Sequence, residues 1–168
     1  MDLSFRTFIF DLFDTLLLKV SFEYDKGINY LAENYFGVEN REKLFALASE
    51  FRSQFMLNRE ETQIEVGFED QLKFYESRLQ LKLKRNYSDI EWEFFLQCRE
   101  ERIANGAIDL LNYLKKRGYA LAILSNSIFS SETLKKYLEM HQILHFFDVV
   151  ISSSDIKYRK PSKKSFEM

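Results

Sequence analysis

Residues 8–18, with the sequence FIFDLFDTLLL, constrain the fold more than any other stretch of the chain. A short apolar run ends there at a carboxylate, Asp11, and a second carboxylate, Asp14, follows with Thr15 beside it. Such a run is typical of a buried strand, and a charge at its end must be solvated, paired or bound to a ligand. The stretch predicts a central strand that ends at a crevice. A turn or a helix cap is the alternative interpretation, because Asp and Thr are common in both.

Two later segments repeat this pattern of an apolar run that ends in polar residues. The strand-like runs are 5–10, 119–124 and 147–152, and the second and third are followed by Ser-Asn and Ser-Ser-Asp. From residue 108 onward, helical and strand-like segments alternate, which favours parallel strands joined by right-handed crossovers. We therefore expect a three-layer α/β/α Rossmann-like core whose strand ends meet at one crevice.

The long stretch between the first and second strands predicts a helical insertion. Apolar residues recur at helical spacing within 44–55 and 68–79, and a connection of this length exceeds what a crossover needs. We expect residues 20–100 to form a helical cap over the strand ends, with 1–19 and 101–168 as the core. The alternative is that these helices pack on a face of the sheet as ordinary crossovers.

Local signals place several helix ends. Ser88 with Glu91 has the pattern of a capping box, and Ser130 or Ser131 would cap a later helix. The basic residues that precede Gly118 predict a helix that ends at that glycine and leads into the second strand.

Composition excludes several classes of function. The chain has 168 residues, 46% of them hydrophobic, with a formal net charge of -2. This balance disfavours a basic nucleic-acid-binding face, and no segment is long and apolar enough to span a membrane. A single cysteine, Cys98, excludes an internal disulfide and a multi-cysteine zinc site, and it fits a reducing cytoplasm. We expect a cytoplasmic protein with a small-molecule substrate and neither nucleic acid nor membrane as a partner.

Three short motifs occur in an order that resembles a known family. They are FDLFDTL at 10–16, LSN at 124–126 and RKPS at 159–162, with Phe166 beyond. Together with the helical insertion between the first two, they resemble the haloacid dehalogenase (HAD) superfamily over nearly the whole chain. The resemblance implies a hydrolase with a parallel-sheet core and a helical cap.

The resemblance also implies a catalytic centre at the first motif. Asp11 holds the position of the nucleophile, which attacks phosphorus, or carbon in dehalogenases, and forms a covalent aspartyl intermediate. A carboxylate is a weak nucleophile, so the attacked group must be held and its charge neutralised. The resemblance implies Mg²⁺ bound by Asp11 and by the backbone carbonyl of Phe13, with Thr15 near the substrate.

The second and third motifs would supply the remaining site residues. Ser125 is expected to donate a hydrogen bond to the transferring group, although an ST-turn is a common role for serine at a strand end. Asn126 is expected to contribute to substrate binding in an anion-binding loop. Lys160 is expected to neutralise charge, although the basic run around it also fits a solvated surface.

Two departures from the family pattern affect the expected chemistry. Phosphatases of the family carry a second aspartate, a general acid and base, where this chain has Phe13, and Asp14 comes one residue later. Only eight residues follow Lys160, so the acidic fourth motif is missing. We therefore expect a truncated chain, a sheet incomplete at its C-terminal side and an incomplete Mg²⁺ site.

The favoured interpretation is a phosphatase that acts on a small phosphorylated metabolite through an aspartyl-phosphate on Asp11. Two alternatives stay open. One is a dehalogenase-type hydrolase that attacks carbon, which the side chain of Phe13 and the apolar cap favour. The other is a non-catalytic HAD-like binding module, which the missing fourth motif favours.

Overall fold

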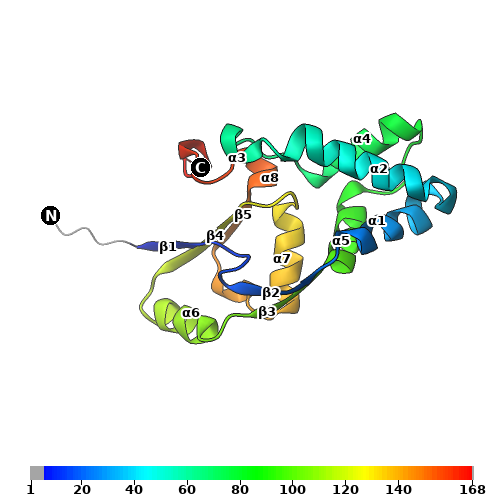
Figure 1. The fold of residues 1–168 in the computed structure, drawn as a ribbon. Coiled ribbons are helices and arrows are strands. Elements are labelled where there is room, and N and C mark those ends of the chain that lie inside the picture. The colour runs from blue at the N-terminus through cyan, green and yellow to red at the C-terminus, as the bar shows by residue number, and fades with distance from the viewer. Residues whose placement is uncertain (1–5, 168) are drawn as a thin grey trace.

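A parallel sheet of three strands forms the centre of the computed structural model, which describes residues 6–167. The strands are β1 (Thr7–Phe10), β4 (Ala120–Ser125) and β5 (Val149–Ser152), in the order β1-β4-β5 (Figure 1). The three predicted strands are confirmed, with residue 5 of the first outside the described residues. The molecule has the α/β class and the Rossmann-like parallel core that the sequence predicts.

The register of the sheet brings the polar strand ends together. Phe10 lies opposite Ile123 in the parallel β1–β4 pair, and Ser125 lies opposite Ser152 in the β4–β5 pair. Asp11, which follows β1, therefore emerges beside the end of β4. This is the edge at which ligands bind in open α/β sheets.

The longer helices of the core are α6 (Ala107–Lys116) and α7 (Ser131–Met140). Gly118 follows α6 with φ 77°, a left-handed conformation that glycine adopts without strain, and the side chain of Ser130 caps α7 by accepting from the Thr133 N–H. Buried residues of α7 and of the sheet share one cluster: Leu121, Ile123, Leu134, Tyr137, Leu138 and Val150.

The opposite face of the sheet is only partly covered by the described residues. Ile9 and Val149 lie in one row of the register, on either side of Ala122, and are 55% and 48% exposed. β1 also lies at the edge of the sheet.

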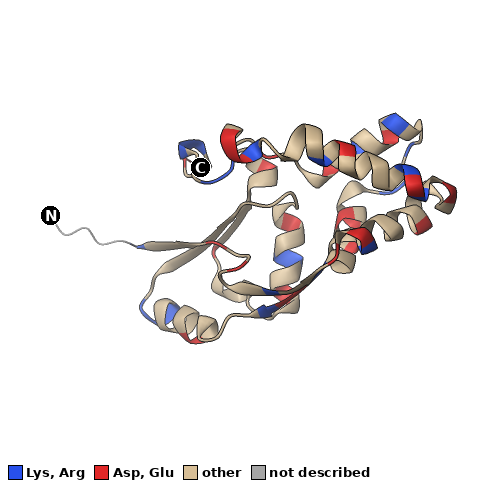
Figure 2. Ribbon diagram, in the orientation of Figure 1, with Lys and Arg blue, Asp and Glu red and all other residues tan. Residues whose placement is uncertain are grey.

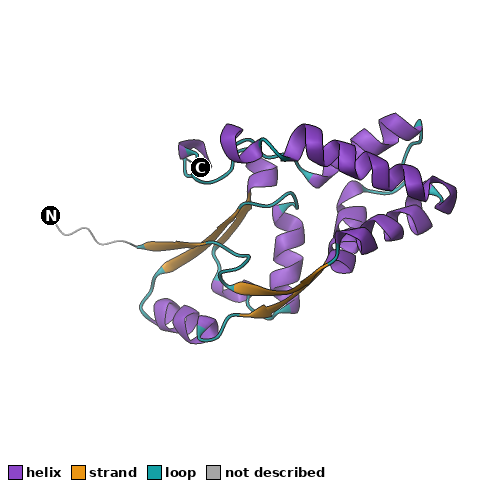
Figure 3. Ribbon diagram, in the orientation of Figure 1, coloured by secondary structure: helices purple, strands orange, loops and turns teal. Residues whose placement is uncertain are grey.

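A second sheet was not predicted. It is an antiparallel pair of β2 (Leu17–Phe22) and β3 (Arg99–Ile103), which carries the chain out to the helices and back (Figure 3). The two strands cross the expected boundaries near residues 20 and 100, so the division into core and cap stays a prediction.

Between these strands lies a helical unit, residues 24–98. Its main helices are α1 (Tyr24–Leu31), α2 (Arg41–Phe51), α4 (Phe68–Leu79) and α5 (Tyr87–Cys98). Its shorter elements are α3 (Arg59–Thr62), two π-helical segments (Ala32–Phe36 and Arg52–Met56) and a 3-10 turn (Val38–Asn40). The core adds α8 (Ser153–Ile156) and two 3-10 turns (Leu144–Phe146 and Lys163–Ser165).

The expected capping box at the start of α5 is wrong. The side chain of Asn86, not that of Ser88, caps the helix by accepting from the Ser88 N–H at 3.1 Å. Glu91 does not reach back to the helix start; it is buried and accepts from the Ser130 N–H at 2.7 Å. A tertiary contact therefore overrides the local pattern.

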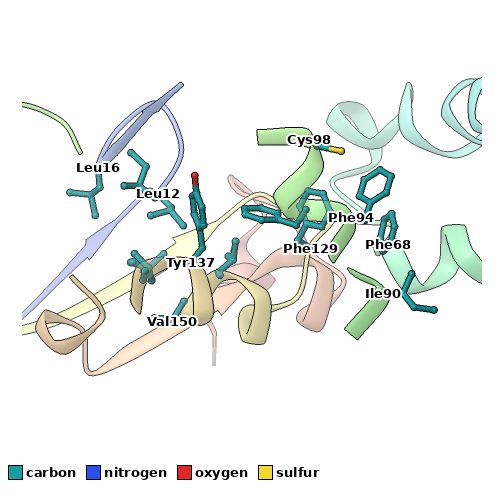
Figure 4. Close-up of a cluster of buried hydrophobic side chains, with 14 of the residues drawn as sticks. Leu12, Leu16, Phe68, Ile90, Phe94, Cys98, Phe129, Tyr137 and Val150 are labelled. Atoms are coloured by element: carbon teal, nitrogen blue, oxygen red, sulfur yellow. The ribbon is translucent and has the colours of Figure 1, made fainter. Parts of the chain in front are cut away.

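An aromatic cluster joins the helical unit to the core. The ring of Phe68 lies 4.4 Å from that of Phe94 and 5.7 Å from that of Phe129, which comes from the loop before α7 (Figure 4). Aromatic pairs at such distances stabilise beyond the area that they bury, so the two parts are packed together rather than merely tethered.

Charged residues of both signs are spread over the helices in the view of Figure 2, whereas β1 and β4 carry none. Among the described helices, none combines the length and the apolar character that crossing a bilayer requires.

Candidate active site

Asp11 and Lys160 meet at the carboxyl end of β1. The Lys160 Nζ lies 2.9 Å from the Asp11 Oδ1, and it donates a hydrogen bond of 2.5 Å to the carbonyl of Leu124. The backbone N–H of Leu12 donates to the same Asp11 oxygen at 2.8 Å. The Asp11 side chain keeps 46% of its surface exposed, so its carboxylate is held in place and still open to a ligand.

The loop that carries Lys160 is anchored to the end of β4 by Asn126. Its side-chain Oδ1 accepts from the Lys160 N–H at 2.7 Å, and its Nδ2 donates to the Lys160 carbonyl at 3.0 Å. Asn126, expected to bind substrate, therefore uses its amide to fix the backbone of the lysine. This pair of bonds determines where the ammonium group can reach.

Ser125 presents a buried hydroxyl without a partner. The residue is 1% exposed, and its Oγ makes no hydrogen bond to any described residue. A buried hydroxyl that lacks a partner costs about 1–3 kcal/mol, and such groups in native structures call for an explanation. A ligand oxygen at the end of β4 would satisfy it.

The remaining residues of the first motif point elsewhere. Thr15 is exposed and makes no side-chain hydrogen bond within residues 6–167. Asp14 is also exposed, adopts a left-handed backbone with φ 57°, and donates its N–H to the Leu17 carbonyl. In the described part of the chain, neither an ion pair nor a hydrogen bond links Asp14 to the Asp11–Lys160 pair.

Phe13 lies two residues after Asp11, where the resemblance described above led us to look for a second aspartate. The guanidinium carbon of Arg99, at the start of β3, lies 3.7 Å from the centre of the Phe13 ring. A cation is attracted to the face of an aromatic ring. Two residues after Asp11, the chain therefore has a phenylalanine ring stacked against an arginine and no second carboxylate.

The described residues provide only part of a magnesium site. Mg²⁺ requires near-octahedral oxygen coordination, and residues 6–167 contain no group of three or more His, Cys, Asp or Glu side chains placed to hold a metal. Asp11 and the Phe13 carbonyl remain as possible ligands, and one Asp11 oxygen already accepts two donors. The described residues therefore do not fit a complete Mg²⁺ site.

Arg159, next to Lys160, is buried in a network of ion pairs that the sequence analysis did not identify. Its side chain is 7% exposed and pairs with the fully buried Glu65, and its Nη2 lies 2.5 Å from the Glu60 carboxylate. The Ser153 hydroxyl donates to Glu65 at 2.7 Å, and Arg59 lies 3.3 Å from it. In the sequence, the only feature that draws attention to Arg159 is its position directly before Lys160 in the third motif.

Backbone contacts strengthen this connection between the helical unit and the lysine loop. The Arg159 N–H donates to the Gln63 carbonyl at 2.9 Å, and the Glu65 N–H donates to the Lys157 carbonyl at 3.0 Å. Ile64 and Tyr158 form an antiparallel β-bridge between the segments 63–65 and 157–159. Residues 63–65 therefore hold the loop that presents Lys160.

A cavity of about 450 Å³ lies between the helical unit and the core. Its walls include Phe22, Met56, Phe129, three arginines (Arg52, Arg59 and Arg99) and Asn126. Asn126 lines the cavity and also holds the backbone of Lys160, so the cavity adjoins the loop that carries this lysine. Its size suits a small molecule.

Solved structures share this fold. A dehalogenase crystal structure aligns with 99% of this chain and 70% of its own, at 22% identity and a TM-score of 0.51. A HAD phosphatase from Thermococcus onnurineus aligns over 96% and 68%, at 18% identity and a TM-score of 0.54. A predicted phosphoglycolate phosphatase from Haemophilus somnus 129pt aligns over 96% and 68%, at 19% identity and a TM-score of 0.50. At these identities the likeness shows the fold alone.

Sequence comparison determines the family. No curated protein matches the chain. A family model described as haloacid dehalogenase-like hydrolase matches residues 5–168, which is nearly the whole sequence. With the parallel sheet and the Asp11–Lys160 contact, this match shows that the chain belongs to the haloacid dehalogenase-like hydrolase family.

Proposed function

We propose that this hydrolase acts on a small phosphorylated metabolite through an aspartyl-phosphate intermediate on Asp11. The observation that carries the proposal is the contact of 2.9 Å between the Asp11 carboxylate and the Lys160 ammonium. Ser125, which ends the neighbouring strand β4 and has a hydroxyl without a partner, would supply a hydrogen-bond donor to the phosphoryl group.

The reaction follows from these three groups. A carboxylate oxygen of Asp11 attacks phosphorus while the bond between phosphorus and the leaving oxygen breaks, and the leaving group takes that electron pair. Lys160 and Ser125 stabilise negative charge on the phosphoryl oxygens, the kind of electrostatic contribution that often dominates catalysis. Water then hydrolyses the acyl phosphate, which restores Asp11 and releases inorganic phosphate.

The absence of an aspartate at the position of Phe13 limits the range of substrates that the site could process. A positioned acid typically contributes about 10²- to 10⁴-fold in rate by protonating the leaving group, and Phe13 cannot do so. We infer that the preferred substrate has a leaving group that is stable without a proton, as an acyl phosphate has.

The same observation supports a second candidate function, hydrolytic dehalogenation. A halide also leaves without a proton. In that reaction Asp11 attacks carbon and displaces halide, and water cleaves the resulting ester to give an alcohol and free Asp11. The fold likeness to a dehalogenase is compatible with this reaction.

A substrate screen with an active-site control tests the proposal. The probes are acetyl phosphate, p-nitrophenyl phosphate, a simple alkyl phosphate and chloropropionate, each with and without Mg²⁺, for the natural chain and for Asp11→Asn. We expect turnover of acetyl phosphate well above that of the alkyl phosphate, and loss of that turnover in Asp11→Asn. Chloropropionate turnover alone would support the second candidate. No turnover of any probe, or full activity of Asp11→Asn, would contradict both.

A further inference from the structure

The charged residues around the cavity do not balance. Four of them line it: Arg52, Arg59, Glu60 and Arg99. Three have a counter-ion, since Arg59 pairs with Glu65 at 3.3 Å, Glu60 with Arg159 at 2.5 Å and Arg99 with Glu101 at 2.6 Å. Arg52 forms no ion pair with any carboxylate of residues 6–167. When these counter-ions are counted with the wall residues, one positive charge, that of Arg52, remains in excess.

Arg99 is fixed in an orientation that leaves part of its guanidinium available. Its Nε donates to the fully buried carboxylate of Glu101, and its side chain is only 14% exposed. Its guanidinium carbon lies 3.7 Å, 5.5 Å and 5.7 Å from the ring centres of Phe13, Phe22 and Phe95. The two terminal nitrogens make no hydrogen bond within the described part of the chain. A guanidinium held in this way presents a fork that matches a carboxylate.

The rest of the cavity wall is mainly apolar. Phe22, Met56, Leu57 and Phe129 contribute to it, from β2, the end of the π-helical segment Arg52–Met56 and the loop before α7. Apolar walls with a few fixed polar groups are typical of sites for small organic ligands. A ligand that satisfies both the apolar wall and the excess charge has an apolar body and one negative group.

We propose that this cavity binds an organic carboxylate with an apolar body, and that Arg52 and Arg99 receive its carboxylate group. This inference deepens the proposed function. It rests on that function in one respect, namely that the carboxylate bound in the cavity is the non-reacting end of the substrate. The substrate would then carry its reacting group at Asp11 and its carboxylate across the cavity. Asn126 lies at the junction, because it lines the cavity and also holds the backbone of Lys160.

A binding experiment tests the carboxylate site without any turnover. The probes are phenylbutyrate, its alcohol phenylbutanol and its amine phenylbutylamine, titrated into the full chain by calorimetry and by NMR. We expect phenylbutyrate to bind about tenfold or more tightly than phenylbutanol, since hydrogen bonds to a charged group contribute that much. Its affinity should also fall as salt concentration rises.

Variants assign the binding to the two arginines. Arg52→Met should lower the affinity for phenylbutyrate about tenfold and leave phenylbutanol unchanged. Arg99→Lys keeps the positive charge but loses the two-pronged guanidinium, so it should weaken phenylbutyrate binding by a smaller factor than Arg52→Met does. The matched control is Lys43→Met, an exposed cation of α2, the helix that directly precedes Arg52; Lys43 does not line the cavity, and its replacement should change neither affinity.

Several results would overturn the inference. They are equal binding of the acid and the alcohol, tighter binding of the amine, no saturable binding of any probe, or a loss in Lys43→Met as large as that in Arg52→Met. Because no chemistry is measured, these outcomes are distinct from a failure of the substrate screen. Carboxylate binding without turnover would contradict the proposed hydrolysis alone.

Discussion

Arg159 and Lys160 are neighbours in the chain, yet their ion pairs differ in kind. The pair of Arg159 with Glu65 is almost completely buried, with side-chain exposures of 7% and 0%. The pair of Lys160 with Asp11 is open, with 21% and 46%. Glu65 is also satisfied by the Ser153 hydroxyl, whereas a carboxylate oxygen of Asp11 remains accessible.

The contrast separates a structural role from a chemical one. Breaking a buried pair leaves an unpaired charge away from water and is costly, whereas an exposed pair contributes little to stability. We therefore expect Arg159 to matter mainly for folding and for holding the loop, and Lys160 mainly for the reaction.

The largest expected effect is on the stability of the Arg159 variant. Arg159→Met leaves the buried Glu65 with only its longer contact to Arg59, at 3.3 Å, so the free energy of unfolding should fall by about 3 kcal/mol, the low end of the range for a broken buried pair. Urea denaturation followed by circular dichroism measures it. The double variant Arg159→Met with Glu65→Met removes both charges and should recover most of the loss. A single variant as stable as the natural chain would show that the buried pair does not hold the loop.

Lys160→Met should show the opposite profile. Removing one group that stabilises transition-state charge typically lowers kcat about 10²- to 10³-fold, while the unfolding free energy should change by less than about 1 kcal/mol because the pair is partly exposed. Steady-state kinetics on the substrate found by the screen, beside denaturation, measures both. A strong loss of stability with unchanged kcat would reverse the roles assigned to the two residues.

Ser125→Ala extends the contrast to an uncharged group. The hydroxyl has no partner, so its removal should leave the free energy of unfolding unchanged or raise it slightly. Activity should fall about tenfold, because one hydrogen bond to a charged oxygen is lost. Thermal denaturation and kcat are compared with those of Ser127→Ala, whose hydroxyl accepts from the Phe129 N–H. Destabilisation of the Ser125 variant would indicate a structural bond at that position.

Glu91 gives the smallest expected effect and the clearest pH dependence. Burial raises the pKa of its carboxyl, against the hydrogen bonds from Ser130 and Thr133 that lower it. Unlike Glu65, it has no cation partner among the described residues. The folded state therefore favours the protonated form, whose stabilising contribution is present at low pH and is lost as pH rises through the raised pKa.

Glu91→Gln removes this titration. The stability of the variant relative to the natural chain should therefore increase between about pH 4 and pH 7. Urea midpoints of both chains across that range provide the measurement. A difference that does not depend on pH would show that Glu91 stays ionised in the folded protein.

Much of the core could be predicted from short-range signals in the sequence. Each of the three apolar runs became a strand, and the polar residues after them predicted that Asp11 and Lys160 would lie close together, as their contact at 2.9 Å shows. The helical spacing within 44–55 and 68–79 also predicted helices correctly. These features depend on periodicity and on strand order, which a single sequence displays.

The remaining features depend on pairing between distant residues. The strand β3 reads as a charged continuation of α5, and only its pairing with β2 makes it a strand. Arg159 looks like part of a solvated basic run, because its partner Glu65 lies far away in the sequence. The cavity likewise combines α2, β3 and the loop after β4.

The most direct test is to trap the covalent intermediate on Asp11. The chain is mixed with acetyl phosphate, quenched rapidly in acid and digested. The masses of the peptides are measured by mass spectrometry, with and without prior treatment with borohydride, which reduces an acyl phosphate to an alcohol. The account predicts a phosphoryl group on the peptide that contains Asp11, conversion of that residue to homoserine by borohydride, and neither product in Asp11→Asn. A phosphoryl group on another residue, or turnover that persists in Asp11→Asn, would contradict it.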